Sequence, residues 1–258
     1  MSARLDVYAV PSLVAPEELT GVTAVVIDVL RATTTILYAF EAGVREVIPC
    51  LEIDEARRTA DSMPRAQVVL GGERGGLAIE GFDLGNSPLE YDADVVNGKT
   101  LVMTTTNGTR AMGACRTAET VLIGAFVNAA ALAERLTGST NIALVCAGSG
   151  GDVTRDDVLF AGLMVDRLQR RSATAYRLNA QAITAQENWL AAVPAPMAVG
   201  TERMPPSLLA DQLRKGLAGQ RLVSIGMEDD LYAAARLDRF DFVPELETQT
   251  FRIRVPGR

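Results

Sequence analysis

Residues 24–43, AVVIDVLRATTTILYAFEAG, read as a strand followed closely by a helix. Ala24–Val29 is a short apolar run interrupted only by Asp28, which is typical of a buried strand. Thr33–Ala42 has helical spacing, and Gly43 is suited to end that helix. A strand joined to a helix by a short turn is the repeating unit of parallel α/β sheets.

The same alternation extends over the first 171 residues. Further strands are predicted at Leu5–Val10, Val44–Pro49, Ala66–Leu70, Thr100–Thr104, Thr120–Ile123 and Asn141–Cys146. Further helices are predicted at Asp54–Asp61, from about Asn107, at Asn128–Leu136 and at Thr154–Arg171. We therefore expect an α/β fold with layers in the order α/β/α and a mostly parallel or mixed sheet, in which the first strand could lie at an edge.

The remainder of the chain favours helices. They are predicted at Ala173–Leu190, Pro206–Leu217 and Glu228–Leu237, followed by strands at Phe240–Val243 and Gln249–Val255. The last strand could form a sheet edge. No linker separates this part from the rest, so we expect residues 1–258 to form a single α/β domain. Residues 173–220 could form a small helical subdomain that covers the site or makes a homodimer contact.

The composition excludes several classes of function. The 258 residues are 48% hydrophobic and 22% charged, which is ordinary for a globular protein. The chain has no histidine, which excludes hydrolases built on Ser-His-Asp or Cys-His and metal sites that need imidazole. A net charge of −7 argues against non-specific nucleic-acid binding. With three cysteines, no long apolar run and no secretion signal, we expect a cytoplasmic protein without a membrane span.

Four segments that follow predicted strands combine polar residues with glycine. Gly71–Pro88 has six glycines in 18 residues and is expected to be a long functional loop. The other three are Asp28–Thr35, Thr104–Arg110 and Cys146–Asp157. Because parallel strands end at one edge of a sheet, these segments should converge there, where helix N-termini favour anions.

Each segment also has a purely structural interpretation. Thr33–Thr35 could simply cap a helix, and Asn107–Gly108 could simply form a turn. Asp156–Asp157 could complement a helix dipole, and the arginines of these segments could be surface salt-bridge partners. Asp28 is harder to explain in this way, because an unpaired charge at the end of an apolar strand is costly.

Three familiar phosphate chemistries do not fit the sequence. It has no G-x-x-x-x-G-K-[ST] pattern, and Asp28 is not followed by a second aspartate two residues later. Asp152 stands where a Cys-x5-Arg pattern starting at Cys146 would need arginine. The carboxylates that remain suit a hard cation that prefers oxygen ligands, for which Mg²⁺ is the default expectation.

Taken together, these segments resemble the 2-phosphosulfolactate phosphatase family. The matching stretches are Ile27–Ile36, Gly72–Gly75, Gly81–Pro88, Thr104–Thr109, Cys146–Gly148, Asp156–Asp157, Ala161–Gly162, Gly226–Asp230 and Phe242–Pro244. Of these, GFDLGNSP at residues 81–88 is the most specific. The resemblance implies a layered α/β phosphatase that depends on Mg²⁺ and converts 2-phospho-3-sulfolactate to 3-sulfolactate and phosphate.

Such a substrate carries a charge of about −3.5 to −4 near pH 7, so an acidic protein needs arginines, helix N-termini and a cation to bind it. We expect Asp28, Glu73 and Asp157 to hold Mg²⁺, and Asp28 with Asp156 or Asp83 to be catalytic. Candidate substrate contacts are Arg31, Thr33, Thr34, Arg74, Asn86, Asn107, Gly108, Thr109, Ser149 and Gly150. Direct attack by water and a phospho-aspartyl intermediate both stay open.

Two alternatives remain at this point. The substrate could be another small phosphorylated hydroxy acid, or the chain could bind anions without catalysis. The carboxylates Asp28, Glu73 and Asp157 argue against the second, since carboxylates repel an anion unless a cation lies between them.

Overall fold

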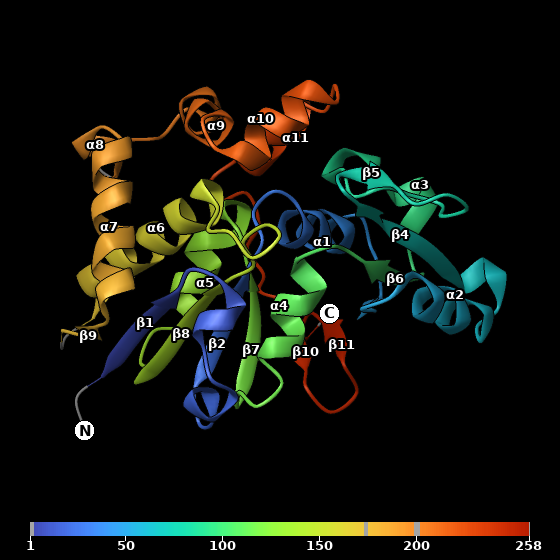
Figure 1. Cartoon of the computed structure of the whole chain (residues 1–258), viewed down its shortest axis with the longest axis horizontal. Coiled ribbons are helices and arrows are strands. Elements are labelled where there is room, and N and C mark those ends of the chain that lie inside the picture. Colours follow the sequence, from blue (N-terminus) through green and yellow to red (C-terminus); the bar gives the residue numbers. More distant parts are fainter. Residues whose placement is uncertain (1–2, 173–174, 199–201, 258) are drawn as a thin grey trace.

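The computed structural model describes residues 3–172, 175–198 and 202–257, and its strands form a mixed sheet (Figure 1). Within these residues the sheet has 11 strands, in the order β5, β4, β6, β3, β11, β10, β7, β2, β8, β1, β9. Their bounds are β1 Arg4–Tyr8, β2 Thr23–Ile27, β3 Glu46–Pro49, β4 Val68–Arg74, β5 Leu77–Ala78, β6 Thr100–Thr104, β7 Thr120–Gly124, β8 Asn141–Cys146, β9 Arg177–Leu178, β10 Glu245–Glu247 and β11 Arg252–Arg254.

Helices cover both faces of this sheet, as the layer order α/β/α predicts. Their bounds are α1 Ala32–Glu41, α2 Ile53–Asp61, α3 Ala93–Val96, α4 Gly108–Ala114, α5 Ala129–Arg135, α6 Arg155–Arg171, α7 Ala180–Ala192, α8 Ala195–Ala198, α9 Pro206–Arg214, α10 Leu217–Ser224 and α11 Asp229–Ala234. In β2, Ala24 and Val26 are buried in the core that contains α1 and α4, whereas Val25 and Ile27 are buried with α5, α6 and α7. The alternation of side chains along a strand thus serves two separate cores, which confirms the expected fold class.

An antiparallel hairpin joins two groups of parallel strands. One group contains β1, β2, β7 and β8, the other contains β3, β4 and β6, and Figure 1 shows β10 and β11 between them. Three successive antiparallel pairings, β7 with β10, β10 with β11 and β11 with β3, reverse the strand direction between the groups. Glu46 in β3 strengthens the junction through ion pairs with Arg252 at 2.6 Å and Arg254 at 2.7 Å.

The structure corrects three expectations about strands. β1 is not an edge strand, because β9 pairs with it on its outer side. Phe240–Val243 is not a strand; its aromatic rings pack against one another and against Tyr38, and the strand begins later, at Glu245. The last strand lies in the middle of the sheet rather than at its edge. The aromatic residues that suggested a strand here reflect burial, not pairing.

The segment Gly71–Pro88 is only partly a loop. β4 continues to Arg74, and β5 pairs back on it in antiparallel fashion. Gly75 and Gly76 form the turn with φ angles of +59° and +87°, which glycine adopts without steric cost. These φ angles disfavour a residue with a side chain, so the two glycines allow the turn to form at the rim of the site described below.

Most of the segment predicted to be helical at 173–220 is helical, although residues 173–174 and 199–201 lie outside the described residues. It contains β9, α7, α8, α9 and the start of α10. α7 packs closely on α6 at Gly162. Any side chain at this position would collide with the carbonyl group of Ala185 in α7, so glycine is what permits the close approach. None of the helices in the described part of the chain has the length and apolar character needed to cross a membrane.

Candidate active site

Loops from both halves of the sheet enclose a cavity of about 150 Å³. Its walls come from the turns that follow β2, β6 and β8, from the β4–β5 turn and from α10. The lining residues are Asp28, Leu30, Arg31, Glu73, Gly75, Gly76, Asn86, Thr106, Asn107, Ser149, Ala218, Arg221 and Leu222. All four segments singled out in the sequence contribute to it.

Hydrogen bonds join these segments directly. Arg31 Nη2 donates to the carbonyl oxygen of Gly76 at 2.8 Å, across the two halves of the sheet. The amide of Gly150 donates to Asn107 Oδ1 at 3.1 Å, which again joins the two halves. The segments therefore come together as expected. They do so where two oppositely directed groups of strands adjoin, and not along one edge of a parallel sheet.

Asp28 stands just after β2 and lines the cavity while remaining 8% exposed. Its Oδ1 accepts a hydrogen bond from the amide of Ala32 at 3.3 Å, at the start of α1. Its Oδ2 lies beside Gly108, where an added Cβ would come within 2.8 Å of it. Gly108 therefore leaves the room that this oxygen occupies at the start of α4.

Asp156 and Asp157 belong to the first turn of α6 and reach the turn after β2. Asp157 Oδ1 accepts from the amide of Val29 at 2.9 Å, and its Oδ2 accepts from the amide of Gly148 at 3.0 Å. Asp156 Oδ2 accepts from the amide of Leu30 at 3.2 Å, whereas its Oδ1 is buried without a hydrogen-bond partner. The two acids thus hold neighbouring loops together, beyond any effect on the helix dipole.

Burial raises the pKa of Asp28 well above its ordinary value, and the charges of Asp157 and Glu73 raise it further. Burial and the charge of Asp157 also raise the pKa of Asp156. For Asp157, burial raises the pKa to about 6, although hydrogen bonds from backbone amides favour the charged form. A group of carboxyls whose negative charge is disfavoured suits proton transfer near neutral pH, or the binding of a cation.

Glu73, near the end of β4, uses both carboxylate oxygens to hold backbone amides. Oε1 accepts from Thr106 at 2.7 Å, and Oε2 accepts from Gly76 at 2.6 Å. Glu73 therefore ties the β4–β5 turn to the turn after β6. The side chain lines the cavity, but both of its oxygens are used to hold these two turns together.

Arg31 lines the cavity but is already paired within the protein. Its Nη1 forms an ion pair with Asp230 Oδ2 at 2.7 Å, and both side chains are 3% exposed. Asp230, from α11, also accepts a hydrogen bond from Ser87 Oγ at 2.5 Å. Because a buried carboxylate neutralises it, Arg31 adds little net charge to the cavity.

The structure does not bring Arg74 or Asp83 to the cavity. Arg74 Nη2 donates to the carbonyl oxygen of Leu51 at 3.0 Å and to Thr104 Oγ1 at 2.8 Å. Asp83 is exposed, pairs with Arg65, and accepts a hydrogen bond from the amide of Leu70 at 2.9 Å. Both side chains are engaged in local structure, away from the groups expected to act with them.

The threonines predicted to contact substrate are buried and serve local structure. The hydroxyls of Thr33 and Thr34 donate to carbonyl oxygens five residues earlier, at 2.9 and 2.8 Å. The hydroxyl of Thr109 donates to the carbonyl oxygen four residues earlier, at 2.8 Å. Gly150 gives its amide to Asn107. The contacts of the three threonines are all local, but Thr33 and Thr34 do not cap a helix as the structural interpretation expected, since no side chain caps the start of α1.

Asn86, Asn107 and Ser149 do line the cavity, as expected, and Asn86 Oδ1 is buried without a hydrogen-bond partner. Sequence reasoning missed Thr106, whose buried hydroxyl also has no partner, although the threonine-rich turn that contains it was a usable signal. It also missed Arg221, because no pattern marks this residue. Only the packing of α10 over the loops brings it to the cavity.

Two carboxylate oxygens accept no hydrogen bond from a described residue and are therefore open to a cation: Asp28 Oδ2 at the cavity wall, and the buried Oδ1 of Asp156, a residue that does not itself line the cavity. Glu73 and Asp157 have both oxygens engaged by amides. Among the described residues, no group of three or more histidine, cysteine or acidic side chains could hold a metal ion. Mg²⁺ is often held by only one or two carboxylates, with water and substrate phosphate as its other ligands. The donors around Asp28 fit that pattern, and the three-carboxylate set is not assembled.

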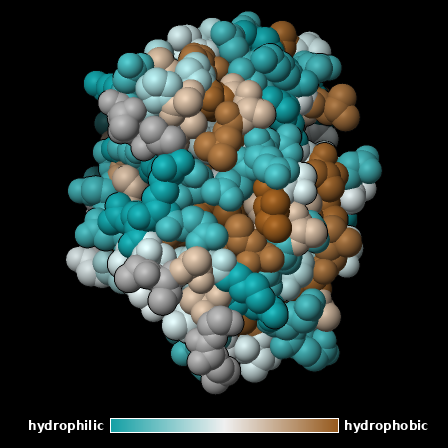
Figure 2. Space-filling model, turned by 90° about the vertical axis from the view of Figure 1, so that its left-hand side faces the viewer, coloured by the Kyte–Doolittle hydropathy of each residue, from teal (hydrophilic) through white to brown (hydrophobic). Residues whose placement is uncertain are grey.

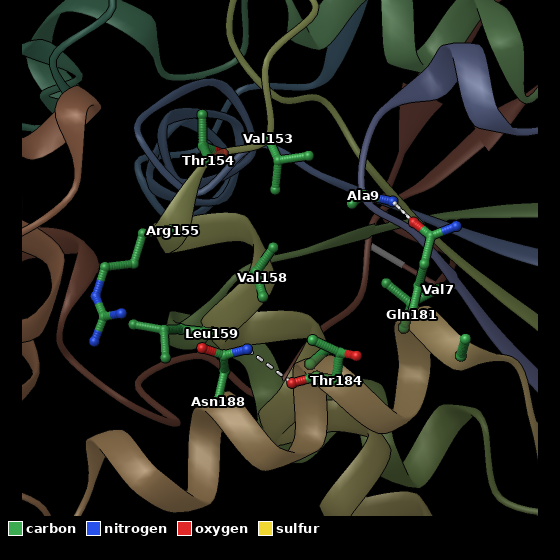
Figure 3. A pocket seen from close by; sticks show the side chains of 12 residues that line it. Val7, Ala9, Val153, Thr154, Arg155, Val158, Leu159, Gln181, Thr184 and Asn188 are labelled. Carbon is green, nitrogen blue, oxygen red and sulfur yellow. Dashed lines mark hydrogen bonds between the residues drawn. The ribbon is translucent and has the colours of Figure 1, made fainter.

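A larger cavity, of about 450 Å³, lies between the end of β1, the start of α6 and α7 (Figure 3). Its described lining contains no carboxylate, and two of its polar side chains bond to backbone groups. Gln181 Oε1 accepts from the amide of Ala9 at 2.9 Å, and Asn188 Nδ2 donates to the carbonyl oxygen of Thr184 at 2.8 Å. The adjoining outer face mixes hydrophobic and hydrophilic side chains (Figure 2). Arg155 also lines this cavity, but its described lining offers no carboxylate that could act as a base or bind a cation.

The fold and the cavity at Asp28 define an α/β protein whose loops present acidic, basic and amide side chains to a small ligand.

A family model described as 2-phosphosulpholactate phosphatase matches residues 8–249. A probable 2-phosphosulfolactate phosphatase from Clostridium novyi (strain NT) is 37% identical over 94% of this chain and 96% of its own length. One from Caldanaerobacter subterraneus subsp. tengcongensis is 34% identical over 96% and 97%. The chain belongs to the 2-phosphosulfolactate phosphatase family, a family of phosphoric monoester hydrolases, which confirms the resemblance of its motifs.

Proposed function

We propose that the protein hydrolyses 2-phospho-3-sulfolactate to 3-sulfolactate and inorganic phosphate in the cavity at Asp28. Family membership supports the type of reaction, and the names of the relatives support the substrate. One observation carries the choice of site: the open oxygen of Asp28 shares a small cavity with donors from Asn86, Asn107 and Arg221. A phosphate monoester needs such donors around its oxygens and a proton acceptor close to phosphorus.

In the proposed reaction Asp28 orients a water molecule towards phosphorus and takes its proton. Burial and the neighbouring acids raise its pKa, which makes the ionised carboxylate a stronger base. The water oxygen bonds to phosphorus as the ester bond breaks, and the proton passes to the departing ester oxygen, which becomes the hydroxyl group of 3-sulfolactate. Attack by Asp28 itself is the alternative, and phosphate label trapped on the protein would distinguish the two.

We propose Mg²⁺ as the cofactor, which the open oxygen of Asp156, water and substrate oxygens would hold, with Asp28 reaching it through water. When bound, it supplies positive charge that offsets the repulsion between these carboxylates and the phosphate. Glu73 and Asp157 would keep the surrounding loops in place through their backbone hydrogen bonds. Asn86 and Asn107 would bind phosphate oxygens through their side-chain amides.

The test is release of inorganic phosphate from racemic 2-phospho-3-sulfolactate, with Mg²⁺ or with EDTA. Phospholactate and phosphoglycolate serve as comparison substrates. We expect release that requires Mg²⁺ and is fastest with the sulfonated substrate. Faster release from a comparison substrate would contradict the substrate assignment, and no release from any of them would contradict the proposed activity.

A further inference from the structure

The charges that line the cavity single out Arg221. Four of the lining residues in the described ranges are charged: Asp28, Glu73, Arg31 and Arg221. Asp230 neutralises Arg31 at 2.7 Å. Arg221 forms no ion pair with a described residue; its guanidinium donates to a backbone carbonyl group. It therefore carries the only uncompensated positive charge among the described residues of the cavity wall.

Backbone contacts hold the guanidinium of Arg221 in a defined place. Its Nε donates to the carbonyl oxygen of Gly75 at 3.0 Å, and its Nη2 donates to the same oxygen. Both protons on Nη1 and one on Nη2 have no hydrogen-bond acceptor among the described residues. An arginine offers five donors, and the edge formed by Nη1 and Nη2 matches two oxygens of one anion. The side chain is thus fixed along one edge and available along the other.

Arg221 and Asp28 belong to different walls of the cavity. Asp28 follows β2, whereas Arg221 lies in α10 together with the lining residues Ala218 and Leu222. A ligand whose phosphate lies at Asp28 and which carries a second acidic group would present that group to α10. The acidic walls at Asp28 and Glu73 repel such a group, so its binding needs a cation of this kind.

We propose that Arg221 is the specificity-determining residue that binds the acidic group which is not transferred, the sulfonate or the carboxylate of the substrate. The inference rests on the proposed function, since it assigns one end of that substrate to α10. A charge-assisted bidentate contact of this kind acts on substrate binding, and because it lies away from phosphorus it acts little on the chemical step.

The experiment compares the wild-type enzyme with Arg221→Gln and Arg221→Lys on 2-phospho-3-sulfolactate and on phospholactate. For Arg221→Gln we expect KM for the sulfonated substrate to rise about 10- to 100-fold, with kcat within about threefold. Arg221→Lys should recover part of the loss, because it restores charge but not the fork. Arg214→Gln is the matched control. Arg214 pairs with Asp211 in α9 and with Glu228 just before α11, and it does not line the cavity.

The comparison substrate identifies which group Arg221 binds. If it binds the sulfonate, KM for phospholactate stays at the wild-type value; if it binds the carboxylate, KM rises for both substrates. Inhibition by 3-sulfolactate should weaken in parallel with KM, while inhibition by inorganic phosphate should not change.

Two results would overturn the proposal: KM within twofold of wild type for both substrates, or a fall in kcat with KM unchanged. Equal melting temperatures for the variants and the wild type check that the β4–β5 turn keeps its place. The proposed function is tested by the wild-type enzyme alone, since its failure would appear as an absence of turnover. The role of Arg221 is tested only by comparing the variants with an active wild-type enzyme.

Discussion

At the scale of single residues, Asp28 and Asp156 are carboxylates that the protein buries with one oxygen each left open. A buried negative charge without a partner opposes folding unless it is protonated or meets a cation. The neighbouring backbone satisfies Glu73 and Asp157 fully, so the open oxygens are a property of two particular residues. That contrast separates the residues that should act on substrate from those that hold the loops.

Asp28→Asn removes the charge and the proton acceptor while keeping the oxygen that accepts from Ala32. We expect kcat to fall by about 10²- to 10⁴-fold, the usual contribution of a general base. The melting temperature should stay the same or rise. Steady-state phosphate release and thermal unfolding measure both, with the exposed Asp54→Asn as control. Activity near the wild-type value would remove Asp28 from the reaction.

Asp156→Asn should stabilise the protein in EDTA at pH 7.5 by about 1–2 kcal/mol, or about 2–6 °C in melting temperature. Because burial raises the pKa of Asp156, its folded state favours the protonated form. The acid therefore contributes stability at low pH that is lost as pH rises through the folded pKa. The advantage of the variant should accordingly shrink towards pH 5. A variant that is less stable than the wild type at pH 7.5 would show that the buried charge of Asp156 does not destabilise the folded protein.

The sequence was sufficient to single out five residues that line the cavity, because each lies at or beyond the end of a strand in a polar, glycine-containing segment: Asp28, Glu73, Asn86, Asn107 and Ser149. It was insufficient for the arginines. Whether an arginine is free depends on partners far away in the chain: Arg31 meets Asp230, 199 residues later. For the same reason no local pattern identifies Arg221.

At the scale of elements, the starts of α1 and α4 approach each other at Gly108. A Cβ there would lie 2.6 Å from Ala32 Cβ and 2.8 Å from Asp28 Oδ2. The close approach lets two helix N-termini, one from each half of the sheet, face one carboxylate. Gly113 in the same helix has open space around it, which makes it a direct comparison.

Gly108→Ala should therefore displace Asp28 and lower kcat/KM at least about tenfold, with a loss of about 1–3 kcal/mol in stability from overpacking. Gly113→Ala should keep full activity and gain up to about 1 kcal/mol, because alanine favours the helix. Denaturant unfolding and phosphate release provide both values. Equal behaviour of the two variants would refute the steric role given to Gly108.

Elements with a clear period were predictable, and those defined by distant pairing were not. β6 and β8 have the predicted bounds, and α6 begins one residue later than predicted. The C-terminal hairpin was misplaced because its neighbours, β3 and β7, are far away in the chain and share no local signal with it. The aromatic run at Phe240–Val243 was misleading since core packing and strand pairing favour the same residues.

At the scale of the whole molecule, the site depends on how two oppositely directed halves are joined. Burial by itself would raise the pKa of Glu46, but hydrogen bonds and charges from Arg254 and Arg252 outweigh it and lower that pKa below its ordinary value. Glu46 therefore contributes stability above the pKa of the unfolded chain, and this stability is lost as pH falls through the folded pKa.

Glu46→Gln should lower the melting temperature at pH 7 by about 2–4 °C, equivalent to about 1 kcal/mol, since both arginines are partly exposed. The difference from the wild type should shrink as pH falls through the lowered pKa of Glu46. Activity at 25 °C should be unchanged, because Glu46 lies outside the cavity. Melting curves across this pH range test it, and a difference that persists at low pH would contradict the linkage.

The central position of the hairpin also bears on how the chain is made. Arg252 meets Glu46 across 206 residues of sequence. At a synthesis rate of roughly 5–20 residues per second, the ribosome needs about 10–40 s to produce that length. Until β10 and β11 emerge, β3 and β7 each present a strand edge with unpaired backbone groups. The edge of β3 stays unpaired for this whole interval, and the edge of β7 joins it once residues 120–124 are made, so aggregation during translation is the hazard that this topology creates.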